Sequence, residues 1–184
     1  MARTPSLMVA LGSLAPAFAL PDTITGKRVS FNDIKGEQAT VVLFICNHCP
    51  FVKHVNNELV KMANDYKSKK IGFAAISAND AVNYPEDAPE MMKKVALQLN
   101  YPFPYLYDET QETAKAYGAA CTPDFFIYNR KDELVYRGQL DDSRPSNEIP
   151  VTGNDIRRAL DCLVSNQPVP AEQRPGIGCN IKWK

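Results

Sequence analysis

The chain has no excess of charge of either sign. Its 184 residues include 21 Lys and Arg and 21 Asp and Glu, so the formal net charge at pH 7 is zero. Proteins that bind DNA or RNA carry a basic surface that neutralises phosphates. The balanced charge therefore gives no reason to expect a nucleic-acid partner.

Long hydrophobic runs are also absent. A helix that crosses a bilayer needs about 20 consecutive apolar residues, and no stretch of this sequence reaches that length. We therefore expect no membrane partner.

The first twenty residues imitate a signal peptide, with Arg3, an apolar stretch over 7–14 and small residues before position 20. Gly12 interrupts the apolar stretch, however. Alternatively, residues 17–20 form a strand and residues 28–31 form the returning strand of a hairpin. Signal cleavage would cut this hairpin in two. We therefore expect the hairpin and a cytoplasmic protein.

Disulfide staples are not expected. The chain has five cysteines, an odd number, and its 45% hydrophobic content is enough for a core without cross-links. One domain over residues 1–184 is the default for this length. Within it we expect an N-terminal hairpin extension over 1–36, and a proline-rich linker and tail over 167–184.

The sequence is organised around two cysteines that follow an apolar run. Residues 41–45 are all apolar, which favours a strand that is covered on both faces. Cys46 and Cys49 come next, and Pro50 suits the first turn of a helix. One face of that helix is predicted by the apolar spacing of Val52, Val55, Leu59, Met62 and Tyr66.

This placement has chemical consequences. The N–H groups and the dipole of a helix N-terminus lower the pKa of a nearby cysteine below about 8.5, and the thiolate is the reactive species. A second thiol two residues away can close a disulfide. A Cys-x-x-Cys pair before a helix, in an α/β pattern, indicates redox chemistry.

The rest of the chain continues the α/β pattern. Another apolar strand over 71–77 follows the first helix, so the two strands and the helix form a parallel βαβ unit. The polar residues 79–89 are expected to be an exposed loop. Later segments are predicted as helices over 90–100 and 109–117, strands over 102–107, 124–128 and 134–137, and a last helix that begins with a capping-box pattern at 152–155.

Four motifs resemble the thioredoxin superfamily. They are Ala15-Pro16-Ala17-Phe18-Ala19-Leu20-Pro21-Asp22, Cys46-Asn47-His48-Cys49-Pro50, Cys121-Thr122-Pro123-Asp124-Phe125-Phe126 and Gly178-Cys179-Asn180-Ile181-Lys182-Trp183. The first is similar to the opening of the redoxin (AhpC/TSA-type) branch. Together they resemble a subgroup that joins a peroxiredoxin-like body to a thioredoxin-type Cys-x-x-Cys. The resemblance implies a thioredoxin-like α/β fold, with a central mixed sheet flanked by helices.

The resemblance also implies roles for individual residues. Cys46 matches the exposed nucleophile that attacks a substrate disulfide, and Cys49 matches the thiol that resolves the mixed disulfide. Pro123 matches a cis-proline that faces the dithiol, and Thr122 matches the residue whose backbone pairs with the substrate. Supporting positions are His48, which would stabilise a thiolate, and Pro50, which opens the helix.

Two further thiols are candidate auxiliaries. Cys121 lies beside the expected cis-proline and could be a third redox thiol, although we favour the simpler interpretation of a small residue that fits a crowded loop. Cys179 would need the tail to fold back across the active-site face. One departure from thioredoxins is that residues 40–45 contain no carboxylate to move the proton of the second cysteine.

Zinc is the main alternative use of Cys46 and Cys49, with ligands drawn from His48, His54, Cys121 or Cys179. A structural zinc site needs a second paired ligand set, and the sequence has none. We therefore expect no metal and no cofactor beyond the redox-active disulfide.

The leading functional interpretation is a thiol–disulfide oxidoreductase that acts on protein disulfides and is recharged by a reductant such as thioredoxin or glutathione. The alternative is a thiol peroxidase with Cys49 as peroxidatic cysteine, acting on peroxide. That reaction would need an arginine, for which Arg137 and Arg144 are the candidates. A third hypothesis is a non-catalytic redox sensor.

Overall fold

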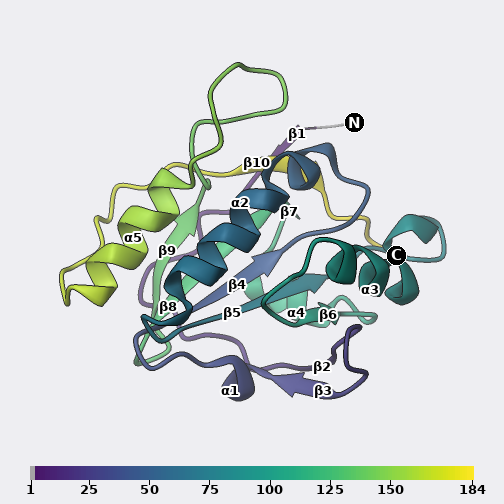
Figure 1. Ribbon diagram of the computed structural model, residues 1–184, viewed down its shortest axis with the longest axis horizontal. Coiled ribbons are helices and arrows are strands. Elements are labelled where there is room, and N and C mark those ends of the chain that lie inside the picture. Colours follow the sequence, from purple (N-terminus) through teal and green to yellow (C-terminus); the bar gives the residue numbers. More distant parts are fainter. Residues whose placement is uncertain (1–2) are drawn as a thin grey trace.

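The computed structural model describes residues 3–184, and five of its strands form a central mixed sheet. The strand order is β6-β5-β4-β8-β9. The central strand β4 pairs in parallel with β5 and antiparallel with β8 (Figure 1). The bounds are β4 Ala39–Phe44, β5 Ile71–Ser77, β6 Tyr105–Tyr107, β8 Asp124–Asn129 and β9 Leu134–Gly138.

Helices cover both faces of this sheet, and the central strand β4 is buried on both sides. All six of its side chains are buried, and alternate residues point to opposite faces. On one face lie α2 (Pro50–Lys67), α3 (Pro89–Gln98) and α5 (Asn154–Val164). On the other lie the short helices α1 (Phe31–Ile34) and α4 (Glu112–Tyr117). This is the thioredoxin-like α/β fold that the sequence predicts.

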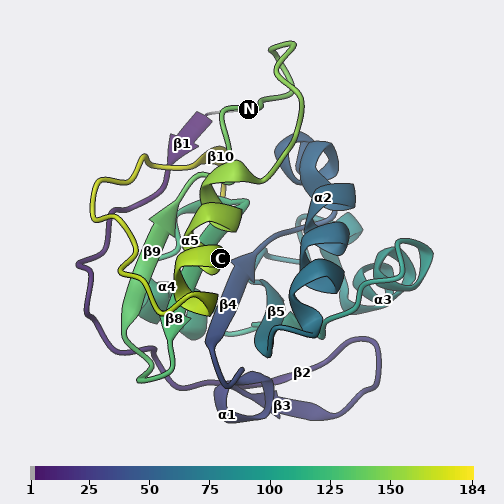
Figure 2. The same cartoon turned by 60° about the vertical axis from the view of Figure 1, so that its left-hand side comes forward.

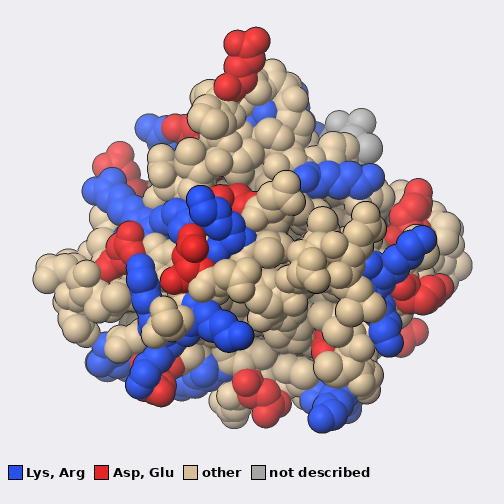
Figure 3. All heavy atoms as spheres, viewed as in Figure 1, with Lys and Arg blue, Asp and Glu red and all other residues tan. Residues whose placement is uncertain are grey.

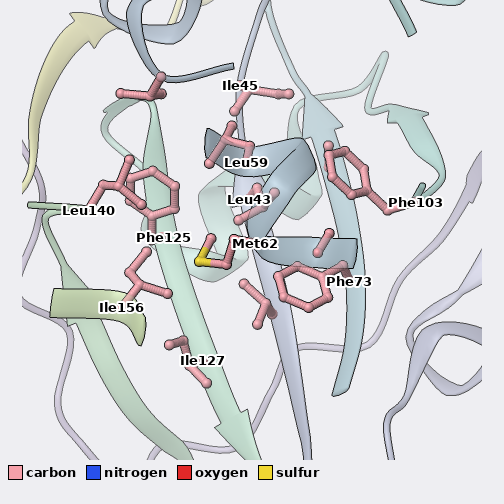
Figure 4. Close-up of a cluster of buried hydrophobic side chains, with 14 of the residues drawn as sticks. Leu43, Ile45, Leu59, Met62, Phe73, Phe103, Phe125, Ile127, Leu140 and Ile156 are labelled. Carbon is pink, nitrogen blue, oxygen red and sulfur yellow. The ribbon is translucent and has the colours of Figure 1, made fainter. Parts of the chain in front are cut away.

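The larger core lies between α2 and the sheet. Figure 4 shows Leu59 and Met62 of α2 over Leu43 of β4, with Phe125 and Ile156 to one side. The predicted helical face of α2 is buried, as expected. This core holds the start of α2 firmly against the end of β4.

The start of α5 differs from the expected capping box. Its N-cap is Gly153, in a left-handed conformation (φ 67°), and no side chain caps the helix. Asp155 accepts a hydrogen bond from Gln139 instead. The expected capping pattern is therefore wrong.

The N-terminal hairpin is present as β2 (Ala19–Pro21) paired antiparallel with β3 (Arg28–Ser30). The loop over residues 79–89 was expected to be exposed, but Asn79, Asp80 and Asp87 are buried in it. Part of this loop is the 3₁₀ helix η1, Pro85–Asp87. The side chains of Asn79, Asp80 and Asp87 face the protein, whereas Asn83 and Glu86 of the same loop are exposed.

The two ends of the chain form a second sheet. Its order is β1-β10-β7, where β1 is Arg3–Pro5, β10 is Ile177–Asn180 and β7 is Cys121–Thr122. Figure 2 shows the purple strand β1 beside the yellow β10. The C-terminal tail therefore folds back onto the loop that carries Thr122. A redox role for Cys179 depends on this arrangement.

The tail is ordered along its length. Ile181 is buried, whereas the indole of Trp183 is 43% exposed and lies near Lys115. The two side chains therefore do not share one buried face. Backbone hydrogen bonds from Ile181 N to Ala120 O and from Asp80 N to Lys182 O hold the tail on the domain.

Basic and acidic side chains are interspersed on the face drawn in Figure 3. Among the described residues, no helix is long and apolar enough to cross a membrane.

Candidate active site

Cys46 and Cys49 lie where β4 ends and α2 begins. Cys49 is the N-cap of α2, and Pro50 occupies the first turn, as the sequence predicts. Both thiols are buried, with 1% of Cys46 and 0% of Cys49 exposed. The expectation of an accessible Cys46 is therefore wrong for this structure.

The loop that carries Thr122 packs directly on the dithiol. The Thr122–Pro123 peptide bond is cis, as the sequence predicts. The carbonyl oxygen of Thr122 lies 3.1 Å from Cys49 Sγ, and its hydroxyl lies 3.3 Å from Cys46 Sγ. One residue thus contacts both sulfurs.

The third sulfur at the site comes from the tail. Cys179 of β10 is opposite Thr122 of β7 in the antiparallel register. Its Sγ lies 2.9 Å from Cys49 Sγ, and Cys179 itself is 2% exposed. The structure thus brings together Cys46, Cys49, Thr122 and Cys179 from three separate segments.

The surroundings of the sulfurs favour a thiolate on Cys49. Hydrogen bonding from the Cys46 thiol, followed by Cys179, Thr122 and the N–H of Val52, lowers the pKa of Cys49 to about 5 against the opposing effect of burial. The pKa of Cys46 is raised by its hydrogen bond to Cys49, by burial and by the nearby charge of Asp87. This order differs from the one that the role of Cys46 as first nucleophile implies.

Cys179 is the protonated neighbour in this arrangement. Burial, and then its hydrogen bond to Cys49, raise the pKa of Cys179 to about 12. A thiol of this kind donates to the Cys49 thiolate and so stabilises it.

His48 is held by a buried acid. Its Nδ1 lies 2.6 Å from Oδ2 of Asp87, and its ring stacks on Tyr84 at 5.5 Å. The hydrogen bond to Asp87 raises the pKa of His48, which favours the imidazolium. Backbone N–H groups of Asn47 and His48 donate to the other oxygen of Asp87, and Asn79 donates to Oδ2.

Sequence reasoning missed Asp87. It is fully buried and lies 39 positions after His48 in a segment that was interpreted as an exposed loop. No local pattern marks it, because its partners come from other segments. Asp87 places a carboxylate near Cys46, whereas residues 40–45 contain none.

A second buried carboxylate follows the cis-proline. Asp124 is 0% exposed, and burial raises its pKa to about 6. Its Oδ2 accepts from Ala120 N, while Oδ1 has no hydrogen-bond partner among the described residues. Burial, and then the charge of Asp124, raise the pKa of the neighbouring Cys121 thiol.

One group of potential metal ligands among the described residues includes two members of the alternative zinc set, Cys46 and His48. Ligand atoms of Cys46, His48 and Asp87 lie within 4.8 Å of one another. The His48–Asp87 hydrogen bond accounts for much of this proximity. His54 lies apart from this group, with its Nε2 2.7 Å from Ser143 Oγ.

The solved structures of two other proteins match this chain over nearly its whole length. An uncharacterised conserved protein from Geobacillus kaustophilus is 63% identical, with a TM-score of 0.99, over 100% of this chain and 97% of that one. A hypothetical protein from Sinorhizobium meliloti 1021 is 45% identical, with a TM-score of 0.96, over 98% of each chain.

The thioredoxin domain of a thiol-disulfide oxidoreductase from Bacteroides vulgatus is 23% identical. Its TM-score is 0.59, over 70% of this chain and 88% of that one, which shows a shared fold. No curated protein sequence matches at a significant level. The match to the AhpC/TSA family covers residues 11–137, more than half of the chain, and supports a redox function at the level of the family. The chain therefore belongs to the AhpC/TSA family.

Proposed function

We propose that the protein is a thiol–disulfide oxidoreductase that uses Cys46 and Cys49 as its dithiol–disulfide couple. The observation that carries the proposal is the contact of Thr122, in the cis Thr–Pro loop, with both sulfurs at the start of α2. The chemistry needs no cofactor beyond these thiols, and glutathione or a thioredoxin would serve as the external reductant.

In the first step, the thiolate attacks a substrate disulfide. A bond forms between the enzyme sulfur and one substrate sulfur, and the other substrate sulfur leaves as a thiolate. The second enzyme thiol then attacks, so that Cys46–Cys49 forms and the remaining substrate thiol is released. Two electrons pass from the enzyme to the substrate.

We assign the first attack to Cys49. Hydrogen bonds from Cys46 and Cys179 lower the pKa of Cys49, which favours its thiolate, whereas the pKa of Cys46 is raised. Cys46 would then close the disulfide, so the two roles implied by the resemblance to thioredoxin are exchanged.

The second candidate function is a thiol peroxidase. It is favoured by the lowered pKa of Cys49, the position that the resemblance assigns to a peroxidatic cysteine. The hydrogen bonds of the two candidate arginines disfavour it, because neither arginine donates to a sulfur in them. Arg137 donates to Val9 O and Gln173, and Arg144 donates to Asp141 O, Ser143 O and Gln139, so both are engaged away from the sulfurs.

The deciding experiment assays insulin reduction with dithiothreitol and peroxide consumption on the same preparation. We expect insulin reduction that is lost in Cys49→Ser and retained in Cys162→Ser, because Cys162 lies on α5 outside the site. Rapid peroxide consumption without insulin reduction would favour the peroxidase. Loss of both activities, with thiols that still change redox state, would favour the sensor.

A further inference from the structure

The tail presents its cysteine to the dithiol at contact distance. Cys179 Sγ lies 2.9 Å from Cys49 Sγ, while Cys46 contacts Thr122. No local sequence pattern requires this approach, since 130 positions separate Cys49 from Cys179. A disulfide between these two sulfurs needs only a small closure from this distance.

The position of Cys179 is fixed from both sides. Its strand β10 lies between β1 and β7, with Cys179 opposite Arg3 on one side and Thr122 on the other. Downstream, Lys182 N donates to Asn79, and Gln111 donates to Lys182 O. These hydrogen bonds therefore fix the Cys179 thiol at the site.

The backbone beside Cys179 is closely fitted. A Cβ on Gly178 would lie 2.1 Å from Thr122 O and 2.6 Å from Thr122 C, distances that no side chain tolerates. Glycine at this position allows β10 to approach the cis Thr–Pro loop. The approach in turn sets the distance between the two sulfurs.

We propose that Cys179 is a third catalytic thiol, which exchanges with Cys49 to form a Cys49–Cys179 disulfide. This inference rests on the proposed function, because it concerns the same dithiol. From the oxidised couple, the Cys179 sulfur attacks Cys49 Sγ, the Cys46–Cys49 bond breaks and the Cys49–Cys179 bond forms. Cys46 leaves as a thiolate and takes up the proton that Cys179 loses, so no external oxidant is needed.

The same chemistry clears a mixed disulfide at Cys49. When oxidised glutathione reacts with Cys49, one glutathione leaves and the other stays bound to Cys49. Attack by Cys179 on Cys49 then releases the second glutathione and leaves Cys49–Cys179. In a Cys46→Ser variant, Cys179 is the thiol that can perform this step.

The experiment uses the full chain with Cys46→Ser and Cys162→Ser, treated with oxidised glutathione, quenched in acid, alkylated and digested without reduction. Cleavage after Lys53 and Glu172 places Cys49 and Cys179 on separate peptides. We expect the linked Cys49–Cys179 peptides as the main product. A stable glutathione adduct on Cys49 with alkylated Cys179 overturns the inference and leaves the proposed function intact. An unmodified Cys49 overturns the inference and returns the first attack to Cys46, and the insulin assay then decides the proposed function.

Gly178→Ala, placed in the same background, tests the role of the docked strand without removing any sulfur. We expect the linked product to fall at least fivefold and the glutathione adduct to rise by the same amount. Gly26→Ala is the control for a strained substitution away from the site, because Gly26 lies in the β2–β3 turn at φ 74° and an added Cβ there meets nothing within 4 Å. An unchanged product ratio in Gly178→Ala counts against the inference. If circular dichroism shows that Gly178→Ala is unfolded, the Cys46→Ser experiment decides.

Discussion

Nδ1 of His48 lies 2.6 Å from Oδ2 of Asp87, a carboxylate that is completely buried. The pair sits next to the dithiol, and the charge of Asp87 also raises the pKa of Cys46. Asp87 therefore acts on both the histidine and the first cysteine. Its position suggests that it sets the protonation states around the couple.

The first prediction concerns Asp87→Asn. The hydrogen bond to Asp87 raises the pKa of His48 above 6.5, so the stability that this bond provides is present below pH 6.5 and is lost as the pH rises through the folded value. Asp87→Asn should lower the pKa of His48, as measured by the pH dependence of its ring NMR signals. His54, which contacts Ser143, is the internal control. An unchanged His48 titration would contradict the assigned cause.

A second prediction concerns the redox potential. A protonated His48 stabilises the thiolate and therefore the reduced form, so we expect a potential near −200 to −230 mV, above the roughly −270 mV of thioredoxin. His48→Pro should lower the potential by about 30 mV or more, which corresponds to about 1.4 kcal/mol. Equilibration with glutathione measures it.

His48→Pro also removes the backbone N–H that donates to Asp87, so His48→Gln should be compared with it. His54→Gln is the control at the other histidine. A potential at or below that of thioredoxin, unchanged in both His48 variants, would rule out the electrostatic role.

The third prediction identifies the attacking sulfur. With Cys179→Ser in the background, Cys46→Ser should accumulate a mixed disulfide at Cys49, because both thiols proposed to resolve it, Cys46 and Cys179, are replaced. Cys49→Ser in the same background should form the corresponding adduct at Cys46 much more slowly, since the pKa of Cys46 is raised. Mass spectrometry after brief treatment with oxidised glutathione measures both rates. A faster adduct at Cys46 would return the first attack to that residue.

The fourth prediction concerns Asp124. Its pKa is raised from 3.8 to about 6 by burial, so the folded state binds this proton more tightly than the unfolded state. The carboxyl group therefore adds stability as the pH falls from about 6 to about 4, by roughly 3 kcal/mol at about 1.4 kcal/mol per pH unit. Urea unfolding at several pH values should show this gain in the wild type and not in Asp124→Asn. Glu172 is exposed, so Glu172→Gln should keep the wild-type dependence of the unfolding free energy on pH. The same pH dependence in all three proteins would contradict the assigned role of Asp124.

A final prediction concerns the core beneath α2. Leu59 is 0% exposed, and Leu59→Ala should lower the free energy of unfolding by about 2–5 kcal/mol through lost burial and the cavity that remains. Leu97 of α3 is 57% exposed, so the same substitution there should change stability by about 0.5 kcal/mol or less. Denaturant unfolding measures both. Similar losses would indicate that the packing of α2 is not as described.

Much of the fold follows from local patterns. The apolar run before Cys46 predicts a covered strand, and the structure shows β4 buried along its whole length. The change to helical spacing after Pro50 predicts α2, and the apolar segment over 71–77 is β5. These elements were predictable because periodicity and proline placement act over a few neighbouring residues.

The capping of α5 and the loop over 79–89 were not predictable in this way. Gly153 begins α5 with a left-handed backbone and no capping side chain. Asp87 is buried because Asn47, His48 and Asn79 donate to it. A polar side chain becomes a buried one only where such partners meet, and no short pattern specifies that meeting.

The sequence by itself determined that two thiols lie at a strand–helix junction, and that a Thr–Pro loop belongs to the same site. Only the tertiary structure decided which further groups reach those thiols. Cys179 contacts Cys49 across 130 positions because β10 inserts between β1 and β7. Asp87 contacts His48 because η1 packs beside the start of α2. Both contacts depend on where distant parts of the chain lie in the packed domain, and no local segment determines that.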